Sequence, residues 1–568
     1  MTIPNAEARK RLHGPGIPLR TLAGPMSLAS GIAIPALCAV SPLMPVTLAS
    51  TLGVTALSST LLGAGAGSFM RWRRRGDLYL PPVHADGLVM GMTEQGLPFV
   101  WPDAEQPYHG LIVGQSGAGK TNQLWNVFVQ QVLRGGAAIF VNAKPSDDDL
   151  KMLWWLVRAT GREHQLRVLL PGDPRSSHSW NPLQWGTPEQ RTNLLTSLRT
   201  IGTTSATDYY HGAQDDALSA VVGTLCTAGG PFMWGDVLAG LVSPTGRERL
   251  LRIGKWKGYT DLAEVMGQYR RGDRGFDGSR GFDEEKWLDI LRGILQLLRR
   301  YVRSEARRIV LTERGDIDLR DVVRKRQLLY VALPTQTAQK SAFEWGNLIV
   351  NALCAVAGDC IKEGVHPSVP VLVILDECPE YLSRGMGSAF TQWRSAHMCV
   401  FAAAQQISQL LSRPLEEVGR QILGNSGCKE FLRQEEWEDA EAAAAQIGKR
   451  IQLRASYGVG TSQARTQKGS GASYSGSHTS EQRGLREEED YAVRPEELRG
   501  LPDGVLYHRF AKGHERLRSP YVSVPPEWLT PYEKHDYPTR NPGGIGLWEE
   551  HQGEVMAALG KLRLEGVE

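Results

Sequence analysis

One short segment restricts the possible folds of this chain more than any other feature. Residues 114–121 read GQSGAGKT and fit the pattern G-x-x-x-x-G-K-[ST], a loop that encloses phosphate groups. The loop follows the apolar run 111–113 and precedes an amphipathic stretch over residues 121–134. A strand, a phosphate loop and a helix in this order predict an α/β nucleotide-binding fold.

Each residue type in this loop has a chemical reason. We expect the glycines to let backbone amides close around phosphate oxygens, the Lys120 ammonium to reach the β and γ phosphates, and the Thr121 hydroxyl to bind Mg²⁺. The sequence therefore predicts a site for ATP and Mg²⁺. Its binding residues are Gly114, Gln115, Ser116, Gly117, Ala118, Gly119, Lys120 and Thr121.

A second motif lies about 255 residues further along the chain. Residues 371–375 are apolar throughout, as in a buried central strand, and Asp376 and Glu377 follow them. We expect Asp376 to hold the magnesium shell and Glu377 to act as general base toward the attacking water. An apolar strand that ends in two carboxylates is common by itself, but together with the phosphate loop it predicts a hydrolytic site.

Further apolar runs bounded by turn residues predict other strands of the same sheet, with helical stretches between them. These runs are 137–141, 167–170, 328–333 and 398–403. Strands that alternate with helices indicate a mostly parallel, doubly wound α/β sheet with the nucleotide at the carboxyl ends of its strands. Between Leu183 and Asp316 the pattern is helical, with few β-rich runs.

The amino-terminal region has the pattern of a membrane anchor. Residues 21–70, a span of 50, contain no charged side chain, and one bilayer crossing requires about 20 residues. Pro42 and Pro45 divide this span into 21–41 and 45–69, and arginines lie on both sides of it. We expect a two-helix transmembrane hairpin with both ends in the cytoplasm, rather than a cleaved signal peptide or one tilted span.

Overall charge and cysteine usage are less informative. A formal charge of +3 on 568 residues does not by itself indicate a nucleic-acid partner. The seven cysteines form no CxxC pair, so neither a zinc site nor a disulfide framework is predicted, and a reducing compartment fits best.

The order of these features resembles one family, the coupling proteins of type IV secretion and conjugation of the TraG/TraD kind, within the hexameric HerA/FtsK group of RecA-like motors. The resemblance covers roughly residues 20–530. It rests on the hairpin, GQSGAGKT, the segment 179–183, a helical insertion, VLVILDE and AAAQQISQL. It implies a RecA-like P-loop NTPase that is a multi-pass protein of the bacterial inner membrane and forms a homo-hexamer.

The resemblance also implies roles for two residues outside the two motifs. In the family a glutamine that ends the strand after the carboxylates senses the γ phosphate, which here falls on Gln405, with Gln406 as the alternative. An arginine on the helix before that strand reaches the nucleotide of the neighbouring subunit. Arg394 has this position, and Arg384 and Arg413 are its competitors.

Where family members often carry an aspartate, this chain has Asn142, so a ligand role for Asn142 or Lys144 stays open. We expect five parts of the chain. They are a membrane anchor (1–76), a first nucleotide-binding part (77–184), an inserted all-α domain (185–316), a second nucleotide-binding part (317–532) and a carboxyl-terminal tail (533–568).

Three further segments have a composition that bears on partners. Residues 458–484 are rich in Gly, Ser and Thr and predict a mobile loop. A helical stretch over 547–564 would dock cargo or close the domain. Basic and aromatic residues alternate in the insertion, which suits single-stranded nucleic acid, although acidic residues among them favour a solvated link between helices. The basic and aromatic residues are Lys255, Trp256, Lys257, Tyr259, Tyr269, Arg270, Arg271, Arg274, Phe276 and Arg280.

The combined reading is a membrane-anchored ATPase that couples a relaxase–DNA substrate to a type IV secretion channel. Its expected partners are single-stranded DNA, relaxase or another secreted protein, the channel components and the inner membrane. Two alternatives stay open, a coupling ATPase for protein effectors and a docking platform that binds nucleotide without pumping. A chromosome-segregation translocase is disfavoured, because the sequence pattern after the ATPase does not indicate a separate DNA-reading domain, although the segment beyond Tyr532 has room for a compact one.

Overall fold

The protein is described from a computed structural model. It describes residues 78–199, 205–270, 281–413, 416–467, 473–534 and 544–561. Within these ranges no helix has both the length and the apolarity that a membrane crossing requires. The predicted hairpin over 21–41 and 45–69 lies outside the described residues.

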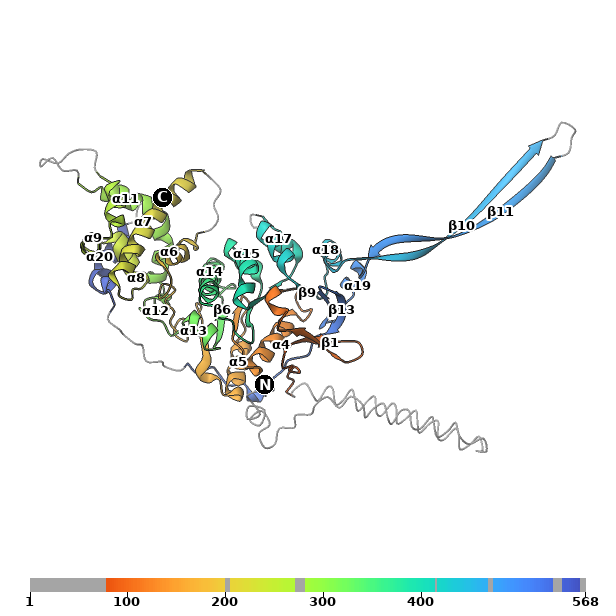
Figure 1. The fold of residues 1–568 in the computed structure, drawn as a ribbon, viewed down its shortest axis with the longest axis horizontal. Helices are drawn as coiled ribbons and strands as arrows, with labels where there is room; N and C mark the ends of the chain where they lie inside the picture. Colours follow the sequence, from red (N-terminus) through yellow and green to blue (C-terminus); the bar gives the residue numbers. More distant parts are fainter. Residues whose placement is uncertain are drawn as a thin grey trace, which may run out of the picture.

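The central element is a large mixed sheet (Figure 1). Within the described residues it has eleven strands in the order β2-β1-β13-β12-β9-β3-β8-β7-β4-β6-β5. Their bounds are β1 Gly87–Met92, β2 Pro98–Pro102, β3 Gly110–Val113, β4 Ala138–Asn142, β5 Leu166–Leu169, β6 Leu328–Ala332, β7 Val371–Leu375, β8 Met398–Ala404, β9 Cys428–Phe431, β12 Val505–Phe510 and β13 Gly513–Arg518. The strands from β9 to β5 are parallel, which confirms the predicted mostly parallel sheet.

Side chains of the parallel strands alternate between two apolar cores, one on each face of the sheet. Ile112 of β3 and Phe140 of β4 pack with α4 (Lys120–Leu133) and α5 (Asp147–Thr160) on one face. Val113 and Val141 belong to the opposite core, which includes α14 (Gln339–Glu363) and α15 (Arg384–Gln392). Because strand residues alternate in direction, both faces need a helical cover, and the sheet is doubly wound.

Helix α4 is buried on more than its apolar side. Gln123 Nε2 donates to the Met90 carbonyl at 2.7 Å, and Asn126 Nδ2 donates to the Val89 carbonyl at 3.0 Å. Gln130 both accepts from the Val89 amide at 2.7 Å and donates to the Val89 carbonyl at 2.9 Å. These amide side chains attach α4 to strand β1, so the helix that follows the phosphate loop is fixed on both sides.

The strand pattern is interrupted between β5 and β6 by helices alone, which form the inserted domain at one end of the molecule (Figure 1). Its helices are α6 Pro188–Thr196, α7 Ser205–Ala228, α8 Trp234–Val242, α9 Pro244–Lys257, α10 Asp261–Gly267, α11 Glu284–Arg303 and α12 Arg307–Val310. Helix α11 places Trp287, Leu291 and Leu298 in the core of this domain at helical spacing. Short helix α13 (Leu319–Arg324) then leads back to the sheet.

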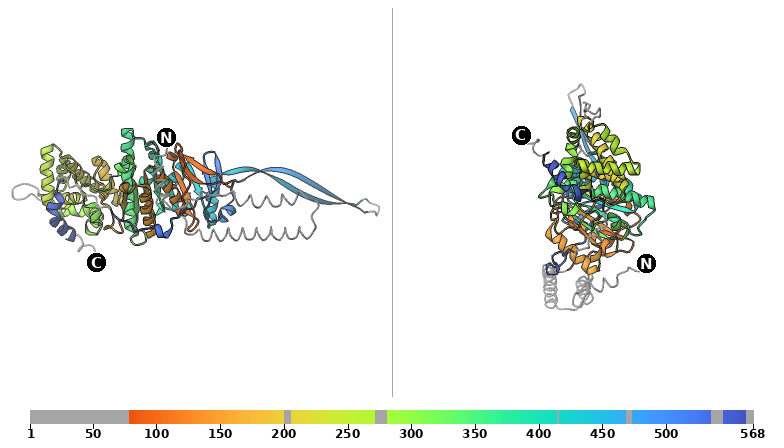
Figure 2. Two further views of the ribbon diagram at one scale, coloured as in Figure 1. Left: turned by 90° about the horizontal axis from the view of Figure 1, so that it is seen from below. Right: turned by 90° about the vertical axis from the view of Figure 1, so that its left-hand side faces the viewer.

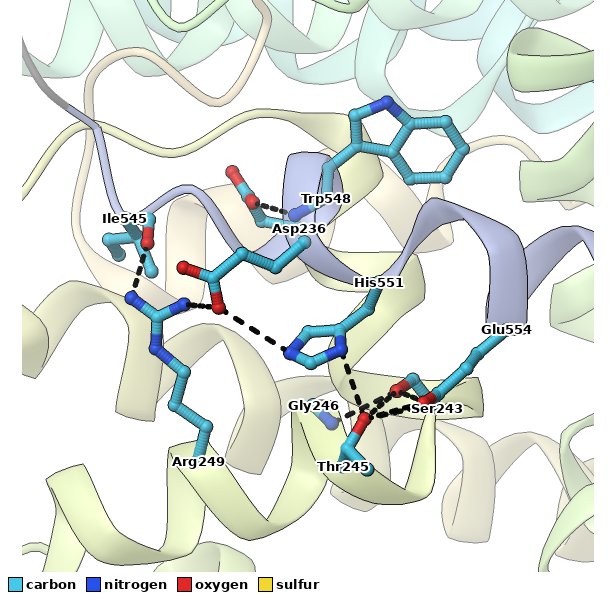
Figure 3. A network of polar contacts seen from close by, with 10 residues as sticks. Asp236, Ser243, Thr245, Gly246, Arg249, Ile545, Trp548, His551 and Glu554 are labelled. Carbon is cyan, nitrogen blue, oxygen red and sulfur yellow. Dashed lines mark hydrogen bonds and ion pairs between the residues drawn. The ribbon is translucent and has the colours of Figure 1, made fainter.

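The carboxyl-terminal helix α20 (Leu547–Lys561) is not a separate tail. It packs against α8 of the inserted domain, more than 300 residues earlier in the chain (Figure 3). The buried Asp236 carboxylate accepts from the Trp548 amide at 2.8 Å, and Thr245 Oγ1 donates to Glu554 at 2.9 Å. The sequence leaves open whether this helical stretch docks cargo or closes the domain, since sequence proximity does not show which distant surface covers an apolar face. The contacts place the helix against the inserted domain.

Contact between α8 and α20 depends on the absence of a side chain at Gly235. A Cβ atom there would lie 2.5 Å from the Trp548 ring. We expect Gly235→Ala to destabilise the docked helix by about 1–3 kcal/mol, because the ring cannot move without breaking the packing. Hydrogen exchange of the α20 amides should increase. Gly553→Ala is the matched control, because nothing lies within 4 Å of its added methyl group, and exchange faster than wild type in both variants would contradict this reading.

The Gly- and Ser-rich segment forms regular structure. Strands β10 (Lys449–Gln467) and β11 (Ser473–Tyr491) pair antiparallel in continuous register from Lys449↔Tyr491 to Gln467↔Ser473. This ribbon extends from the end of the molecule opposite to the inserted helices (Figures 1 and 2). The expectation of a structureless loop over 458–484 is wrong for residues 458–467 and 473–484. Low apolar content excludes a core, whereas a ribbon needs only backbone hydrogen bonds.

The described basic and aromatic residues of the insertion differ in their surroundings. Trp256 is 79% exposed at the end of α9, with the Lys257 ammonium 4.6 Å from its ring centroid. Tyr269, by contrast, is buried against Trp287 in the domain core. Residues 271–280 lie outside the described ranges.

Candidate functional site

The candidate site lies where four neighbouring parallel strands end. In the sheet these strands follow one another as β3, β8, β7 and β4. The phosphate loop follows β3, Gln405 follows β8, Asp376 and Glu377 follow β7, and Lys144 lies two residues beyond β4. All four carboxyl ends meet at one edge of the sheet, because the strands are parallel.

The phosphate loop has the backbone that its glycines predict. Gly117 and Gly119 have φ angles of 81° and 106°, a left-handed region that side chains with a Cβ rarely adopt. Helix α4 then begins at Lys120, so its free amino-terminal amides face the loop. The loop and helix together provide donors and partial positive charge for an oxyanion.

Glu377 is the centre of the polar contacts at this edge. Its Oε1 atom accepts from Lys120 Nζ at 2.7 Å, from Lys144 Nζ at 3.0 Å and from Gln405 Nε2 at 3.0 Å. Lys120 and Glu377 are both buried, with side-chain exposures of 6% and 7%. Residues from four separate segments therefore meet on one carboxylate oxygen.

Glu377 has an unusual backbone conformation and a shifted pKa. It is a non-glycine residue with φ 46° and ψ 47°, an uncommon conformation that recurs at functional sites. Burial works to raise its pKa, but the Lys120 ammonium and the hydrogen bonds from Lys120, Gln405 and Lys144 outweigh burial and hold the pKa below its ordinary value. In this arrangement Glu377 is a charged carboxylate that accepts three hydrogen bonds.

Asp376 differs from its neighbour. Burial raises its pKa to about 6, although the Lys120 ammonium acts in the opposite direction. Its Oδ1 atom is buried and has no hydrogen-bond partner within the described part of the chain. A buried carboxylate oxygen without a donor fits a hard cation or one of its water ligands, as the expected magnesium role of Asp376 requires.

Lys144 and Asn142, which the sequence leaves open, have different surroundings. Lys144 contacts Glu377 and therefore belongs to the site. Asn142 instead donates to the Tyr330 hydroxyl at 3.1 Å and accepts from the Lys144 amide at 2.9 Å, so it shapes the turn that carries Lys144. The sequence shows that Lys144 follows an apolar strand. Only the strand order shows that this strand, β4, lies next to β7 and so brings Lys144 to Glu377.

The structure brings Gln405 to Glu377, whereas Gln406 is the residue that precedes short helix α16 (Ile407–Leu410). Of the two candidates for a phosphate-sensing amide, Gln405 is therefore the one whose side chain contacts the site.

Arg394 is not part of this cluster. It lies in the turn Trp393–Ala396 before β8, at the opposite end of that strand from Gln405. Its guanidinium lies 3.7 Å from the Tyr108 ring centroid and donates to the Tyr108 hydroxyl. Burial, with the nearby Arg394 charge, lowers the pKa of His109 to about 4, so this histidine is neutral. Arg394 is exposed and far from the phosphate loop of its own chain.

Arg413 and Arg384 are the two competitors of Arg394. Arg413 is exposed after α16, and the side chain of Arg384 lies outside the described residues.

Comparisons with known proteins show what the chain as a whole resembles. A family model described as the TraM recognition site of TraD and TraG matches residues 370–503, which include β7 and β8. The type 4 coupling protein DotL of Legionella pneumophila is 24% identical over an alignment of 412 residues, and the match covers 63% of this chain and 52% of DotL. The chain thus spans about half the length of this curated relative.

Solved structures show the same fold. The conjugative coupling protein TrwBdeltaN70 in its unbound form superposes with a TM-score of 0.54 at 18% identity, over 81% of this chain and 93% of TrwB. TrwB with the ATP analogue ADPNP gives a TM-score of 0.53 at 17% identity, and TrwB with ADP and Mg²⁺ gives 0.52 at 16%, over the same shares of the two chains. The RecA-like α/β fold is therefore shared. The family model, the curated relative and this fold together support a type IV coupling protein.

Proposed function

We propose that this protein is a membrane-anchored, homo-hexameric ATPase that couples a relaxase–DNA substrate to a type IV secretion channel and drives the DNA through it. The observation that carries the hydrolytic part is the contact of Lys120, Lys144 and Gln405 with one oxygen of Glu377. A docking platform that only binds nucleotide has no need of a general base in contact with the loop lysine. This cluster therefore favours hydrolysis over passive binding.

Lys120 has two alternative partners in this proposal. In the structure its ammonium is paired with Glu377 at 2.7 Å. A bound triphosphate offers a stronger anion, so Lys120 turns toward the β and γ phosphates and leaves the carboxylate. The Glu377 carboxylate, released from Lys120, is then available to accept the proton of the attacking water.

ATP and Mg²⁺ are the ligands that this proposal requires, and TrwB has been solved with an ATP analogue and with ADP and Mg²⁺. Thr121 and Asp376 would hold the metal, which when bound spreads the charge that develops on the transferred phosphoryl group. Gln405, which bonds Glu377, would orient the attacking water or contact the γ phosphate.

Membrane attachment, ring formation and DNA as cargo rest on other observations. The uncharged span of residues 21–70 supports an anchor, and the place of Arg394 at the far end of β8 supports a role in a neighbouring subunit. TrwB and DotL are coupling proteins by their own descriptions. These observations support a hexamer at the cytoplasmic mouth of a channel.

The test is nucleotide hydrolysis by the full chain in detergent, measured with and without single-stranded DNA. We expect DNA to raise the ATPase rate several-fold, with Lys120→Ala defining the background. Stimulation by a secreted protein but not by DNA would instead indicate an effector-coupling ATPase. Equal rates for wild type and Lys120→Ala would overturn the hydrolytic proposal.

A further inference from the structure

A cavity of about 510 Å³ opens beside the phosphate loop. The first turn of α4, the first turns of α5 and the segment that follows β13 form its walls. The lining residues that matter here are Thr121, Asn122, Asp148, Lys151, Met152 and Tyr521. The cavity shares Thr121 with the phosphate loop, so a ligand held by the loop can extend into it.

The outer wall is fixed to the residue that directly follows the loop. Asn122 Nδ2 donates to the Pro520 carbonyl at 2.8 Å, and Asn122 Oδ1 accepts from the Val522 amide at 2.9 Å. Backbone on both sides of Tyr521 is therefore held against the start of α4. This attachment sets the position of the Tyr521 side chain relative to Thr121 although the two residues are 400 positions apart.

Tyr521 presents an open aromatic surface at this wall. Its side chain is 66% exposed, and its ring meets that of Tyr79 edge to face, with centroids 6.0 Å apart. A large exposed aromatic side chain beside a cavity is a typical anchor for a flat ligand. Nucleobases of every kind stack on such rings, because every base has a π face.

The charges of the cavity favour an uncharged ligand with hydroxyl groups over a second anion. Asp148 is exposed and pairs with Lys151 at 3.1 Å. Asp149 already accepts from the Ser146 amide at 2.8 Å and from Trp125 Nε1 at 3.2 Å. Two carboxylates against one ammonium would repel phosphate, whereas the free oxygen of Asp148 can accept from a sugar hydroxyl.

We propose that this cavity holds the nucleoside of the bound triphosphate, with Tyr521 stacked on the base and Asp148 accepting from a ribose hydroxyl. The inference rests on the proposed ATPase function. With the γ phosphate toward Glu377, the α phosphate lies at the other end of the loop, and the nucleoside leaves the loop there, at Thr121 and Asn122. Recognition by stacking tolerates any base, so the site selects nucleotides over other phosphates rather than one base over another.

Equilibrium dialysis of the full chain in detergent with radiolabelled ATP tests this without requiring turnover. We expect Tyr521→Ala to weaken ATP binding about tenfold, and Tyr521→Phe to bind as wild type does, because the phenyl ring retains the stacking face. Inorganic tripolyphosphate, which has no nucleoside, should compete with ATP for the loop. Its own affinity should be the same in wild type and Tyr521→Ala. Trp185→Ala, an exposed aromatic outside the cavity, is the matched control.

The outcomes separate this proposal from the one on which it rests. Unchanged ATP affinity in Tyr521→Ala would overturn the nucleoside site while leaving the ATPase intact. Equal loss of ATP and tripolyphosphate binding would also overturn it, because Tyr521 would then act on the shape of the phosphate loop. Failure of the ATPase proposal has a different signature, namely Lys120→Ala binding and hydrolysing ATP as wild type does.

Discussion

Replacing Glu377 by Gln is expected to lower kcat for ATP hydrolysis by about a thousandfold, within the range that a positioned general base contributes. The amide keeps the size of the side chain and can still accept from Lys120 and Lys144, but it cannot take the proton of the attacking water. Affinity for ATP should stay within a few-fold of wild type, because the phosphate loop is unchanged. Steady-state hydrolysis and equilibrium ATP binding, measured on the same preparation, check both parts.

Lys144→Ala is the control for this variant, because it removes a contact of the same oxygen but not the base. It should lower kcat by about tenfold or less, because the Lys144 side chain is half exposed and an ion pair open to solvent contributes little. If Glu377→Gln hydrolysed ATP at a rate close to wild type, the assignment of the base would be wrong. Equal loss in both variants would mean that the cluster, rather than the carboxylate, limits the rate.

Arg394→Ala is expected to lower kcat by about a thousandfold or more, the usual effect of removing an arginine that acts on a neighbouring nucleotide. Arg394 lies at the opposite end of β8 from Gln405, so it cannot act on the triphosphate of its own chain. Arg413→Ala, which removes another exposed arginine, should have little effect. Comparable losses for the two variants would argue against a specific role of Arg394.

Mixing experiments distinguish action on a neighbour from a structural effect. In a ring each site combines Glu377 of one subunit with Arg394 of the next. Subunits with Glu377→Gln and subunits with Arg394→Ala are each inactive, yet an equal mixture should regain activity, since roughly a quarter of its interfaces contain both intact residues. Mixtures of wild-type and Lys120→Ala subunits provide the control that subunits exchange between rings. If that control shows exchange and the first mixture stays inactive, Arg394 does not act across the interface.

The local motifs could be predicted from the sequence because they are made of neighbouring residues. Strand, loop and helix around GQSGAGKT have their predicted order, and the apolar run before Asp376 is strand β7. The antiparallel strands β1, β2 and β13 were not predicted. Strand β1 is almost wholly buried, and its pairing with β13 joins residues more than 400 positions apart, as Met92↔Arg518 shows, so no local pattern encodes it.

The residues themselves determined that a glycine-rich loop of the phosphate-binding pattern joins a strand to a helix, that two carboxylates end a buried strand, and that helices interrupt the sheet. Only the tertiary structure decided that Lys144 and Gln405 share the oxygen of Glu377, that Tyr521 stands beside Thr121, and that α20 covers the inserted domain. Periodicity and loop geometry are encoded within a few residues of each other. The order of strands in a sheet is set by the packing of the whole chain, and it decides which strand ends become neighbours.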